Sequence, residues 1–157
     1  MILRTFTLVD PELHTESLVE DGALVEPGSL LAIVTGPARS LLAAERVALN
    51  LLGQLSGVAT ATRELVDQIS GTSATLVDTR KTVPGLRELQ KAAVLAGGGQ
   101  NHRMGLYDAV LIKDNHIALA GSTKAAVEQA RAAVGPDTTI EIEVESAEEL
   151  EAAIAAG

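Results

Sequence analysis

From residue 71 onward, short apolar segments alternate with helical segments, and this alternation constrains the fold more than any other feature of the sequence. The apolar runs have the length of buried strands, and each is followed by a helical pattern. We expect strands at 74–77, 109–112 and 139–144, and helices at 84–96, 122–134 and 146–155. Strands that alternate with helices form parallel sheets with right-handed crossovers, so we expect an α/β fold, either a barrel or a doubly wound sheet.

The ends of these helices carry recognisable capping signals. Pro84 suits a first helical turn, where its missing N–H is harmless. Ser122 and Ser146 are expected N-caps, the second of them forming a capping box with Glu149. The three glycines at 97–99 are expected to stop the first of these helices.

The first 70 residues follow a different pattern. Partial alternation at 13–19 and 30–34 predicts two strands joined by a turn-rich loop. Leucines at helical spacing follow, and Ser56 and Gly57 interrupt them, which predicts a second helix at 58–69. We therefore divide the chain into segments 1–36, 37–70 and 71–157, the middle one a helical connection.

The number of strand–helix units is small for a closed barrel. Eight such units take about 250 residues, whereas this chain of 157 residues shows three. We therefore expect a partial open α/β barrel, built either as a fragment of a larger protein or as one that other copies complete. Pairing with another chain would cover the exposed sheet edges.

Composition excludes several classes of function. The net charge of -9, the pI of about 4.7 and the near absence of aromatic residues argue against a nucleic-acid-binding protein. The sequence has no cysteine, which excludes disulfides and thiolate metal sites. No apolar run reaches the roughly 20 residues that span a bilayer, so we expect a cytoplasmic protein that does not bind membranes.

Cations are concentrated between residues 79 and 116, although the protein is acidic. Half of the 12 Lys and Arg residues lie in this stretch, and they are Arg80, Lys81, Arg87, Lys91, Arg103 and Lys113. Such a concentration indicates a site for a small, highly charged anion. An Arg binds a carboxylate or phosphate through two parallel hydrogen bonds, and a Lys adds a point charge.

The polar residues of this stretch fall at the ends of the expected strands. Arg80 and Lys81 follow the first strand, Lys113 follows the second, and Glu143 lies near the end of the third. In parallel α/β folds ligands bind at the carboxyl ends of the strands, so we expect these side chains on one rim. A carboxylate there would stay ionised, and would hold Mg²⁺, contact ribose hydroxyls or stabilise developing positive charge.

Other candidates have plainer interpretations beside the functional one. His102 and Arg103 follow the glycines at 97–99, which either allow close approach to a ligand or only stop a helix. The residues 114–116 either join the site or form a turn that caps the next helix. Arg46 lies in an apolar helical stretch, where pattern alone favours a side chain whose head extends into water. The acidic residues between 141 and 151 are expected to form a mostly solvated face.

Three motifs in fixed order resemble a known family. They are TRKTVPGLR at 79–87, GGGQNHR at 97–103 and LIKDNH at 111–116, and EIEVES follows at 141–146. Together with the stretch from Glu45 to Thr62, they resemble quinolinate phosphoribosyltransferase over about residues 18–157. The resemblance implies an N-terminal α/β sandwich, of which 1–36 would be a remnant, and an open α/β barrel beginning near residue 71.

The resemblance also implies a reaction and a set of roles. The family transfers phosphoribosyl from phosphoribosyl pyrophosphate to quinolinate with Mg²⁺ and loses carbon dioxide, giving nicotinate mononucleotide. By position in the motifs, Arg80, His102, Arg103 and Lys113 match residues that bind carboxylates and phosphates, and Lys81 matches a neighbouring basic residue. Glu143 matches a carboxylate that faces the ribose and the metal, so Glu143, Lys113 and Lys81 are the expected catalytic residues. Arg46 matches an arginine delivered by a neighbouring subunit, which implies a homodimer or larger homo-oligomer and replaces the solvated interpretation.

Two alternatives stay open beside this enzyme. One is the paralogue associated with molybdenum transport, which shares the barrel and much of the basic motif set. The other is a non-catalytic assembly module that retains basic residues from an enzyme ancestor. Residues of the phosphoribosyl site that the family carries on later strands have no counterpart here, so we expect the 157 residues alone to be inactive or nearly so.

Overall fold

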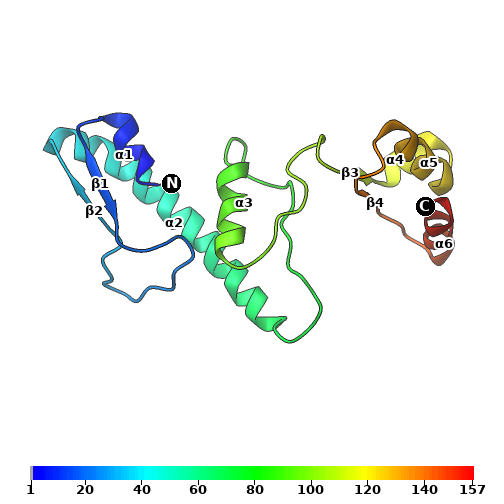
Figure 1. Ribbon diagram of the computed structural model, residues 1–157, viewed down its shortest axis with the longest axis horizontal. Coiled ribbons are helices and arrows are strands. Elements are labelled where there is room, and N and C mark those ends of the chain that lie inside the picture. The colour runs from blue at the N-terminus through cyan, green and yellow to red at the C-terminus, as the bar shows by residue number, and fades with distance from the viewer. Residues whose placement is uncertain (1) are drawn as a thin grey trace. The chain divides into compact units, whose positions relative to one another are not determined.

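The computed structural model describes residues 2–157 and divides into two compact units, one ending at His102 and the other spanning Arg103–Gly157 (Figure 1). The first unit contains α1 (Arg4–Val9), β1 (His14–Ser17), β2 (Ala32–Thr35), α2 (Ala38–Gln68) and α3 (Arg87–Ala96). The second contains β3 (Val110–Ile112), α4 (Asp114–Ala120), α5 (Thr123–Ala133), β4 (Ile140–Ile142) and α6 (Ala147–Ala156). The parallel strands β3 and β4 are each followed by helices, and the α/β class is confirmed.

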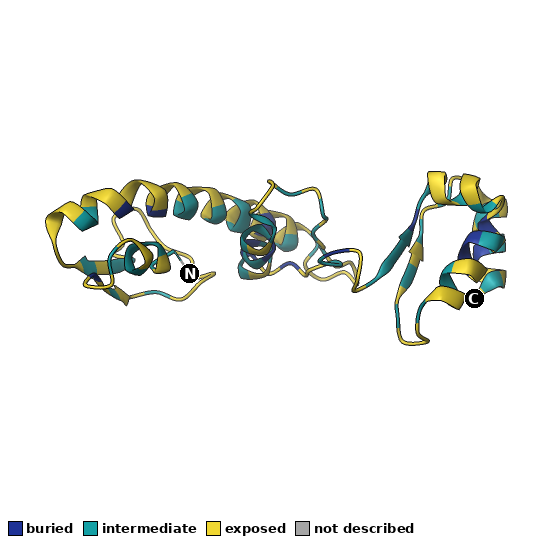
Figure 2. Cartoon of the chain, turned by 90° about the horizontal axis from the view of Figure 1, so that it is seen from above, coloured by how far each residue is buried: buried dark blue, intermediate teal, exposed yellow. Residues whose placement is uncertain are grey.

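The first unit is built around α2. β1 and β2 pair antiparallel with His14 opposite Thr35, as the two predicted strands require. Both α1 and α3 pack on α2. Leu13, Ala44 and Ala48 are almost fully buried, and much of the rest of α2 is exposed (Figure 2).

The helix α2 corrects one prediction. The sequence predicts a break at Ser56 and Gly57, whereas α2 runs through both without interruption from Ala38 to Gln68. A glycine inside a helix costs only about 1 kcal/mol relative to alanine. Packing of α1 and α3 along α2 offsets that cost, so the glycine does not end the helix.

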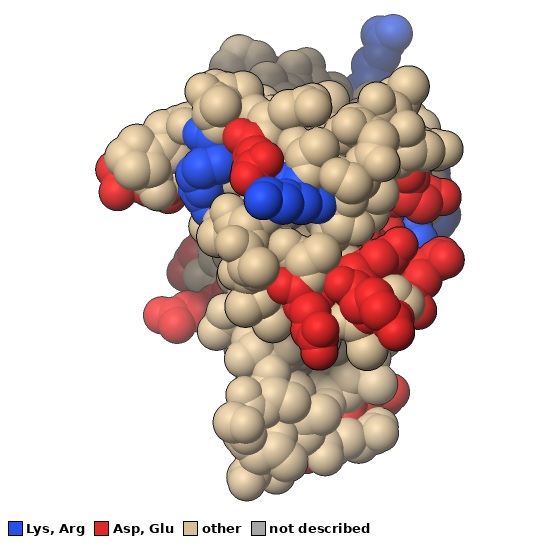
Figure 3. All heavy atoms as spheres, turned by 90° about the vertical axis from the view of Figure 1, so that its right-hand side faces the viewer, with Lys and Arg blue, Asp and Glu red and all other residues tan. Residues whose placement is uncertain are grey.

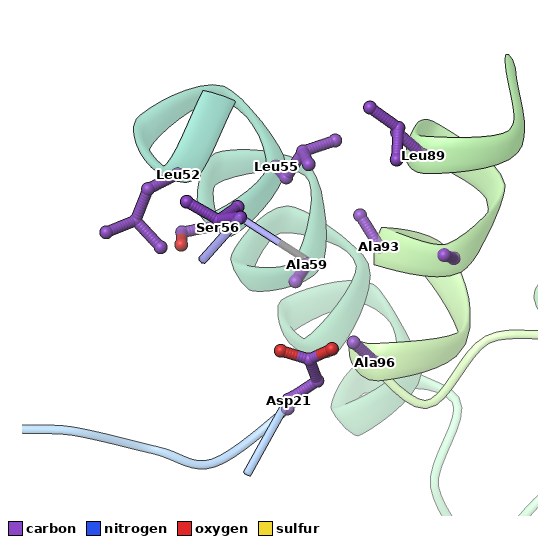
Figure 4. Close-up of a pocket in the computed structure, with 11 residues that line it drawn as sticks. Asp21, Leu52, Leu55, Ser56, Ala59, Leu89, Ala93 and Ala96 are labelled. Atoms are coloured by element: carbon purple, nitrogen blue, oxygen red, sulfur yellow. The ribbon is translucent and has the colours of Figure 1, made fainter. Parts of the chain in front are cut away.

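The helices α2 and α3 meet through small and apolar side chains. Figure 4 shows Leu55 and Ala59 of α2 facing Leu89 and Ala93 of α3, with a small hollow between the helices. The loop at Gly22 closes this hollow, and a Cβ on Gly22 would lie 2.6 Å from the carbonyl oxygen of the last residue of α3. The loop therefore packs tightly against the end of α3.

The start of α3 also differs from the prediction. Pro84 is not in the first helical turn, because 83–86 form a β-turn closed by a hydrogen bond from Leu86 N to Val83 O (3.0 Å). Gly85 has φ of 79°, the positive value that the third position of a type II turn requires. The helix begins two residues after the glycine, at Arg87.

The predicted strand at 74–77 forms only an isolated parallel bridge between Val77 and Gln100. Gln100 N donates to Leu76 O (2.9 Å) and Asp78 N donates to Gln100 O (3.1 Å). The ladder goes no further because the next amide, that of His102, donates to the Asp78 carboxylate (2.9 Å). A side chain has replaced the backbone as hydrogen-bond partner.

The second unit contains a short parallel sheet. β3 and β4 lie side by side with Val110 opposite Ile140 and Ile112 opposite Ile142. Ile112, Ala126 and Val127 form its buried core. The Ser122 cap of α5 is confirmed, since Ser122 Oγ accepts from Ala125 N (3.1 Å).

The capping box of α6 is confirmed in half. Ser146 Oγ accepts from Glu149 N (3.1 Å) as predicted. The Glu149 carboxylate, however, accepts from Glu145 N (2.7 Å), the residue before the N-cap. Figure 3 faces the side on which α4, α5 and α6 lie in Figure 1, and acidic side chains gather there. Glu141, Glu143, Glu145, Glu148 and Glu151 are all exposed, as expected for a solvated face.

No helix within residues 2–157 combines the length and apolar character that crossing a membrane requires.

Candidate anion-binding site

The segment after Val77 is a tightly bonded loop in the first unit. Lys81 N donates to the Thr79 hydroxyl (3.0 Å), and Thr82 N donates to Arg80 O (2.9 Å). These local bonds replace strand pairing and fold 79–82 into successive turns. The loop therefore presents its basic side chains from a backbone with a defined conformation.

Arg87 holds this loop from the first turn of α3. Its Nε donates to the Thr82 hydroxyl (3.2 Å) and its Nη2 donates to Arg80 O (3.2 Å). The guanidinium is thus engaged with the protein itself. Arg87 is one of the six Lys and Arg residues between residues 79 and 116, and in the structure it holds the loop in place.

Lys91 is the second internal cation of the stretch. Its side chain is 1% exposed and forms an ion pair with the Asp78 carboxylate, which is 6% exposed. Lys91 Nζ also donates to His102 O (2.9 Å). The concentration of cations that indicated an anion site therefore includes one Lys that is closed off from solvent.

Lys81 is the accessible cation of the loop. It is exposed and lines a hollow with Thr79, Thr82 and Gln90, and the paired Lys91 and Asp78 line the same hollow. Two hydroxyls, an amide and an ammonium are suitable groups for a carboxylate or a phosphate. Arg80 and His102, in the same unit, are half-buried.

The glycines at 97–99 serve packing between helices. A Cβ on Gly97 would lie 2.4 Å from Ala59 O, and one on Gly99 would lie 2.8 Å from the Val94 side chain. Gly98 has φ of 91° and ends the turn after α3. The helix-stop interpretation is thus the one that the structure supports, because α2 occupies the space beside Gly97.

In the second unit, the ends of neighbouring parallel strands bring Lys113 and Glu143 together. Lys113 Nζ lies 2.6 Å from Glu143 Oε1, and the two side chains are 43% and 55% exposed. The predicted rim is confirmed for this pair, because β3 and β4 are adjacent and parallel. A cation and a carboxylate thus stand side by side, both accessible to a ligand.

Residues 114–116 form the first turn of α4, a helix absent from the prediction. Lys113 N donates to His116 Nδ1 (2.9 Å), so His116 caps the helix start. Asn115 N donates to the Asp114 carboxylate (2.7 Å). These residues thus begin a helix of their own, and they are not a turn that caps the predicted helix at 122–134.

Arg103 begins the second unit and is half-buried. Its Nη1 lies 3.5 Å from Ala109 O, at the start of the segment that leads into β3. The guanidinium therefore contacts the backbone directly before β3, the strand that Lys113 follows.

Carboxylates beside β4 are the candidate metal ligands of the second unit. Glu143 and Asp114 line one hollow together with Glu145 and Glu149. Their oxygens are of the type that Mg²⁺ prefers, and Mg²⁺ in enzymes commonly takes one or two carboxylates plus substrate phosphates. No group of three or more potential metal-ligating residues occurs within the described 2–157. The donor type fits Mg²⁺, with phosphate oxygens needed to complete the coordination.

Arg46 lies on the exposed face of α2. Leu42 and Leu49, one turn away on either side, are 69% and 50% exposed. Within residues 2–157 the Arg46 side chain has no hydrogen-bond or ion-pair partner. An arginine between exposed leucines forms a surface of mixed apolar and cationic character.

Sequence reasoning missed Asp78 and Lys91 as a pair. The available signal was an aspartate directly after a predicted strand and a lysine inside the apolar run KAAVLA. A lysine with apolar neighbours in a helix is rarely buried unless it is paired. The partner lies 13 positions away, so the spacing within either element does not reveal it.

Two family models match this chain. The N-terminal domain model described as "Quinolinate phosphoribosyl transferase, N-terminal domain" matches residues 2–56, and the corresponding C-terminal domain model matches residues 58–157. The similarity therefore also includes residues 2–17, which lay outside the resemblance seen in the motifs.

Curated relatives carry names of the same kind. The chain is 49% identical over 157 residues to the probable nicotinate-nucleotide pyrophosphorylase [carboxylating] of Bacillus subtilis, covering all of this chain and 54% of the relative. It is 53% identical over 137 residues to the nicotinate-nucleotide pyrophosphorylase [carboxylating] of Mycobacterium leprae, covering 87% of this chain and 48% of the relative. The chain thus spans about half the length of these relatives.

Solved structures agree in fold. NadC from Streptococcus pyogenes matches with a TM-score of 0.91 at 45% identity, covering 99% of this chain and 55% of the other. The nicotinate-nucleotide pyrophosphorylase from Francisella tularensis matches with a TM-score of 0.92 at 42% identity, again over 99% and 55%.

Proposed function

This chain belongs to the quinolinate phosphoribosyltransferase family, and we propose that it takes part in the reaction from which that family is named. The ring nitrogen of quinolinate attacks C1′ of phosphoribosyl pyrophosphate, and the bond to pyrophosphate breaks. The carboxyl group next to the nitrogen then leaves as carbon dioxide, and a proton takes its place on the ring. The products are nicotinate mononucleotide, pyrophosphate and carbon dioxide, an enzymatic step in the formation of NAD.

The observation that carries this proposal is the match of both family domains along almost the whole chain. The names of the relatives above favour this enzyme over a molybdenum-transport paralogue or a non-catalytic assembly module. Both substrates are polyanions, which agrees with basic side chains on loops that follow the strands.

The residue roles are assigned separately in the two units. In the unit ending at His102, we assign Arg80 and His102 to the binding of carboxylate or phosphate groups, with Lys81 as a catalytic neighbour. The exposed ammonium of Lys81 in a hollow lined by hydroxyls supports its role. A Lys in such a place stabilises charge that develops on a departing phosphate.

In the unit that begins at Arg103, we assign Arg103 and Lys113 to substrate anions and Glu143 to the ribose. The 2.6 Å contact of Lys113 with Glu143 supports this assignment, because it places a carboxylate beside a cation at the ends of two neighbouring strands. An ionised carboxylate stabilises the positive charge of an oxocarbenium-like ribose in the transition state. Bound Mg²⁺, with Glu143 as its protein ligand, would neutralise the pyrophosphate.

We further assign Arg46 to the active site of a neighbouring subunit in a homodimer or larger homo-oligomer. The exposed leucines beside it support this assignment, since a second copy would cover them. A cytoplasmic location belongs to the same proposal and rests on the cysteine-free composition.

Calorimetric titration with quinolinate tests the proposal. We expect binding to the wild-type protein, and a loss of affinity of about tenfold or more in Arg80→Ala, because a charge-assisted contact is removed. Nicotinate, which lacks the second carboxyl group, is the matched control ligand and should bind more weakly. Absence of quinolinate binding would contradict the proposal.

Turnover is measured separately by chromatography of nicotinate mononucleotide, with phosphoribosyl pyrophosphate and Mg²⁺ present, and we expect little or no product from the 157 residues alone. The decarboxylation step is checked with quinolinate labelled in the carboxyl group next to the ring nitrogen, by measuring the labelled carbon dioxide that is released. Product without labelled carbon dioxide would contradict the carboxylating reaction.

A further inference from the structure

The buried pair of Lys91 and Asp78 is an unusual feature of the first unit. The two side chains come from α3 and from the loop after Val77, and both are closed off from water. Within residues 2–157, no buried side-chain nitrogen or oxygen lacks a partner. The pair is therefore fully bonded, as a buried charge pair must be to persist.

The bonds of this pair converge on one residue. His102 N donates to Asp78 Oδ1 (2.9 Å), and His102 O accepts from Lys91 Nζ (2.9 Å). The Asp78 carboxylate accepts a hydrogen bond from the amide of His102, and the Lys91 ammonium donates one to its carbonyl. Both peptide groups that flank the His102 Cα are thereby fixed, and so is the direction in which its side chain leaves the backbone.

Asn101 adds to the same network. With its amide nitrogen turned towards the carboxylate, Asn101 donates to Asp78 Oδ2 (2.7 Å) and to Lys91 O (3.0 Å). The loop before it is held as well, because Gly97 fits against α2, and Gly99 against the Val94 side chain of α3, too closely for a Cβ. The segment from α3 to His102 is thus fixed along its whole length.

Stability alone does not account for such a pair. Replacing a buried ion pair by apolar residues of similar size is often neutral or stabilising, because the desolvation of two charges offsets their attraction. Apolar residues cannot, however, accept a hydrogen bond from the amide of a loop residue and donate one to its carbonyl. The network is suited to specifying one loop conformation.

We propose that Lys91 and Asp78 are positioning residues, which orient His102 and the adjoining Arg80–Lys81 loop for an anionic substrate. This inference rests on the proposed function, since it takes His102 and Arg80 as ligands of quinolinate or phosphate. Asp78 directly precedes the loop that carries Arg80 and Lys81. Its carboxylate can therefore orient both this loop and the segment at His102. Neither Lys91 nor Asp78 has to touch the substrate for this role.

The test uses the double variant Asp78→Leu/Lys91→Met, which removes both charges and replaces them with apolar side chains. We expect it to stay folded, because no unpaired charge remains buried. The His102 amide should lose its protection from hydrogen exchange, and the Kd for quinolinate should rise about tenfold or more, since misplaced binding groups lose most of their effect. Unchanged quinolinate affinity, or unchanged protection of the His102 amide, would overturn the inference.

A matched control separates positioning from general destabilisation. Ala44→Gly lies in α2, is fully buried and touches none of these bonds. It should lower the melting temperature while leaving His102 protection and quinolinate affinity unchanged. If Ala44→Gly weakened quinolinate binding as much as the double variant does, the role of the pair would be merely structural and the inference would fail.

The two proposals fail in distinguishable ways. If wild-type protein does not bind quinolinate, the proposed function fails, and hydrogen exchange at His102 still decides whether the pair fixes the loop. If the wild type binds and the double variant binds equally well, the proposed function stands and the positioning role fails.

Discussion

At the scale of single residues, charged groups in this protein divide into internal and external ones. Lys91 is 1% exposed and paired, whereas Lys113 is 43% exposed beside Glu143. Exposed pairs contribute about 0.2–1 kcal/mol to stability, because water and salt screen them. The Lys113–Glu143 pair therefore contributes little to the stability of the fold.

Substitutions in this exposed pair should change quinolinate binding in opposite directions. Lys113→Met removes a cation and should weaken binding, whereas Glu143→Gln removes a repelling carboxylate and should strengthen it, by about 1 kcal/mol or roughly fivefold in Kd. Melting temperatures should change little in either variant. Calorimetric titration at low and high salt measures both effects.

A second exposed ion pair provides the control. Lys124 and Glu128 of α5 lie 3.7 Å apart with similar exposure. Lys124→Met and Glu128→Gln should leave quinolinate affinity unaltered. Equal effects at both pairs would show that net charge, and not the place of Lys113, governs binding.

The acid stability of the first unit should depend on Asp10. The Ser40 hydroxyl donates to Asp10 Oδ2 (2.5 Å) and Glu12 N donates to Oδ1 (2.9 Å), and these bonds lower the pKa of Asp10 below its ordinary value of 3.8. A carboxyl group with a lowered pKa in the folded state stabilises the protein above its ordinary pKa. That contribution is lost as pH falls through the lowered value.

Ser40→Ala removes the larger cause of this shift. The variant should be less stable than wild type near neutral pH, and the difference should shrink as pH falls below 3.8. Thermal melts across this pH range measure it. In an Asp10→Asn background, Ser40→Ala should have an effect that does not vary with pH; a pH-dependent one would assign the titration to another group.

At the scale of elements, the glycines at positions 53 and 97 have different structural roles. Gly53 lies inside α2 with nothing within 4 Å of an added Cβ, whereas a Cβ on Gly97 would lie 2.4 Å from Ala59 O. The first glycine only weakens a helix. The second allows α3 to end against α2.

Alanine at these two positions should therefore have effects of opposite sign. Gly53→Ala should stabilise the protein by about 1 kcal/mol through helix propensity. Gly97→Ala should destabilise it by about 1–3 kcal/mol, because the backbone of α2 must move. Denaturant unfolding measures both, and a stabilising Gly97→Ala would contradict the packing described here.

At the scale of the whole molecule, the exposed face of α2 is the feature that the fold of one chain leaves unexplained. Leu42 and Leu49 flank Arg46 and are largely exposed. Apolar residues grouped on one helix face indicate an interaction surface. Association of two copies through this face would bring Arg46 to a neighbour, as the proposed function requires.

Leu49→Asp should therefore weaken self-association and shift the protein towards monomer, because a buried unpaired charge is costly in an interface. Light scattering coupled to gel filtration measures the mass in solution. Leu24→Asp, at a leucine that is 95% exposed in the loop between β1 and β2, is the matched control and should have no effect. A monomeric wild type would contradict the proposed oligomer.

Much of this molecule follows from local sequence. Ser122 and Ser146 mark the starts of α5 and α6 because an N-cap bond joins residues three positions apart. The α/β class follows from the alternation of apolar strands with helices. Lys113 and Glu143 were predicted on one rim because neighbouring parallel strands end at the same edge.

What only the tertiary structure decided involves contacts between residues distant in the sequence. The burial of Lys91 depends on its bonds to Asp78 and His102, and these three residues are bonded to one another across separations of 11, 13 and 24 positions. The fit of Gly97 against α2 and the unbroken course of α2 through Gly57 depend likewise on neighbouring helices. A residue's charge, spacing and propensity are fixed by the sequence, but whether a cation faces water or a buried carboxylate is decided by what packs over it.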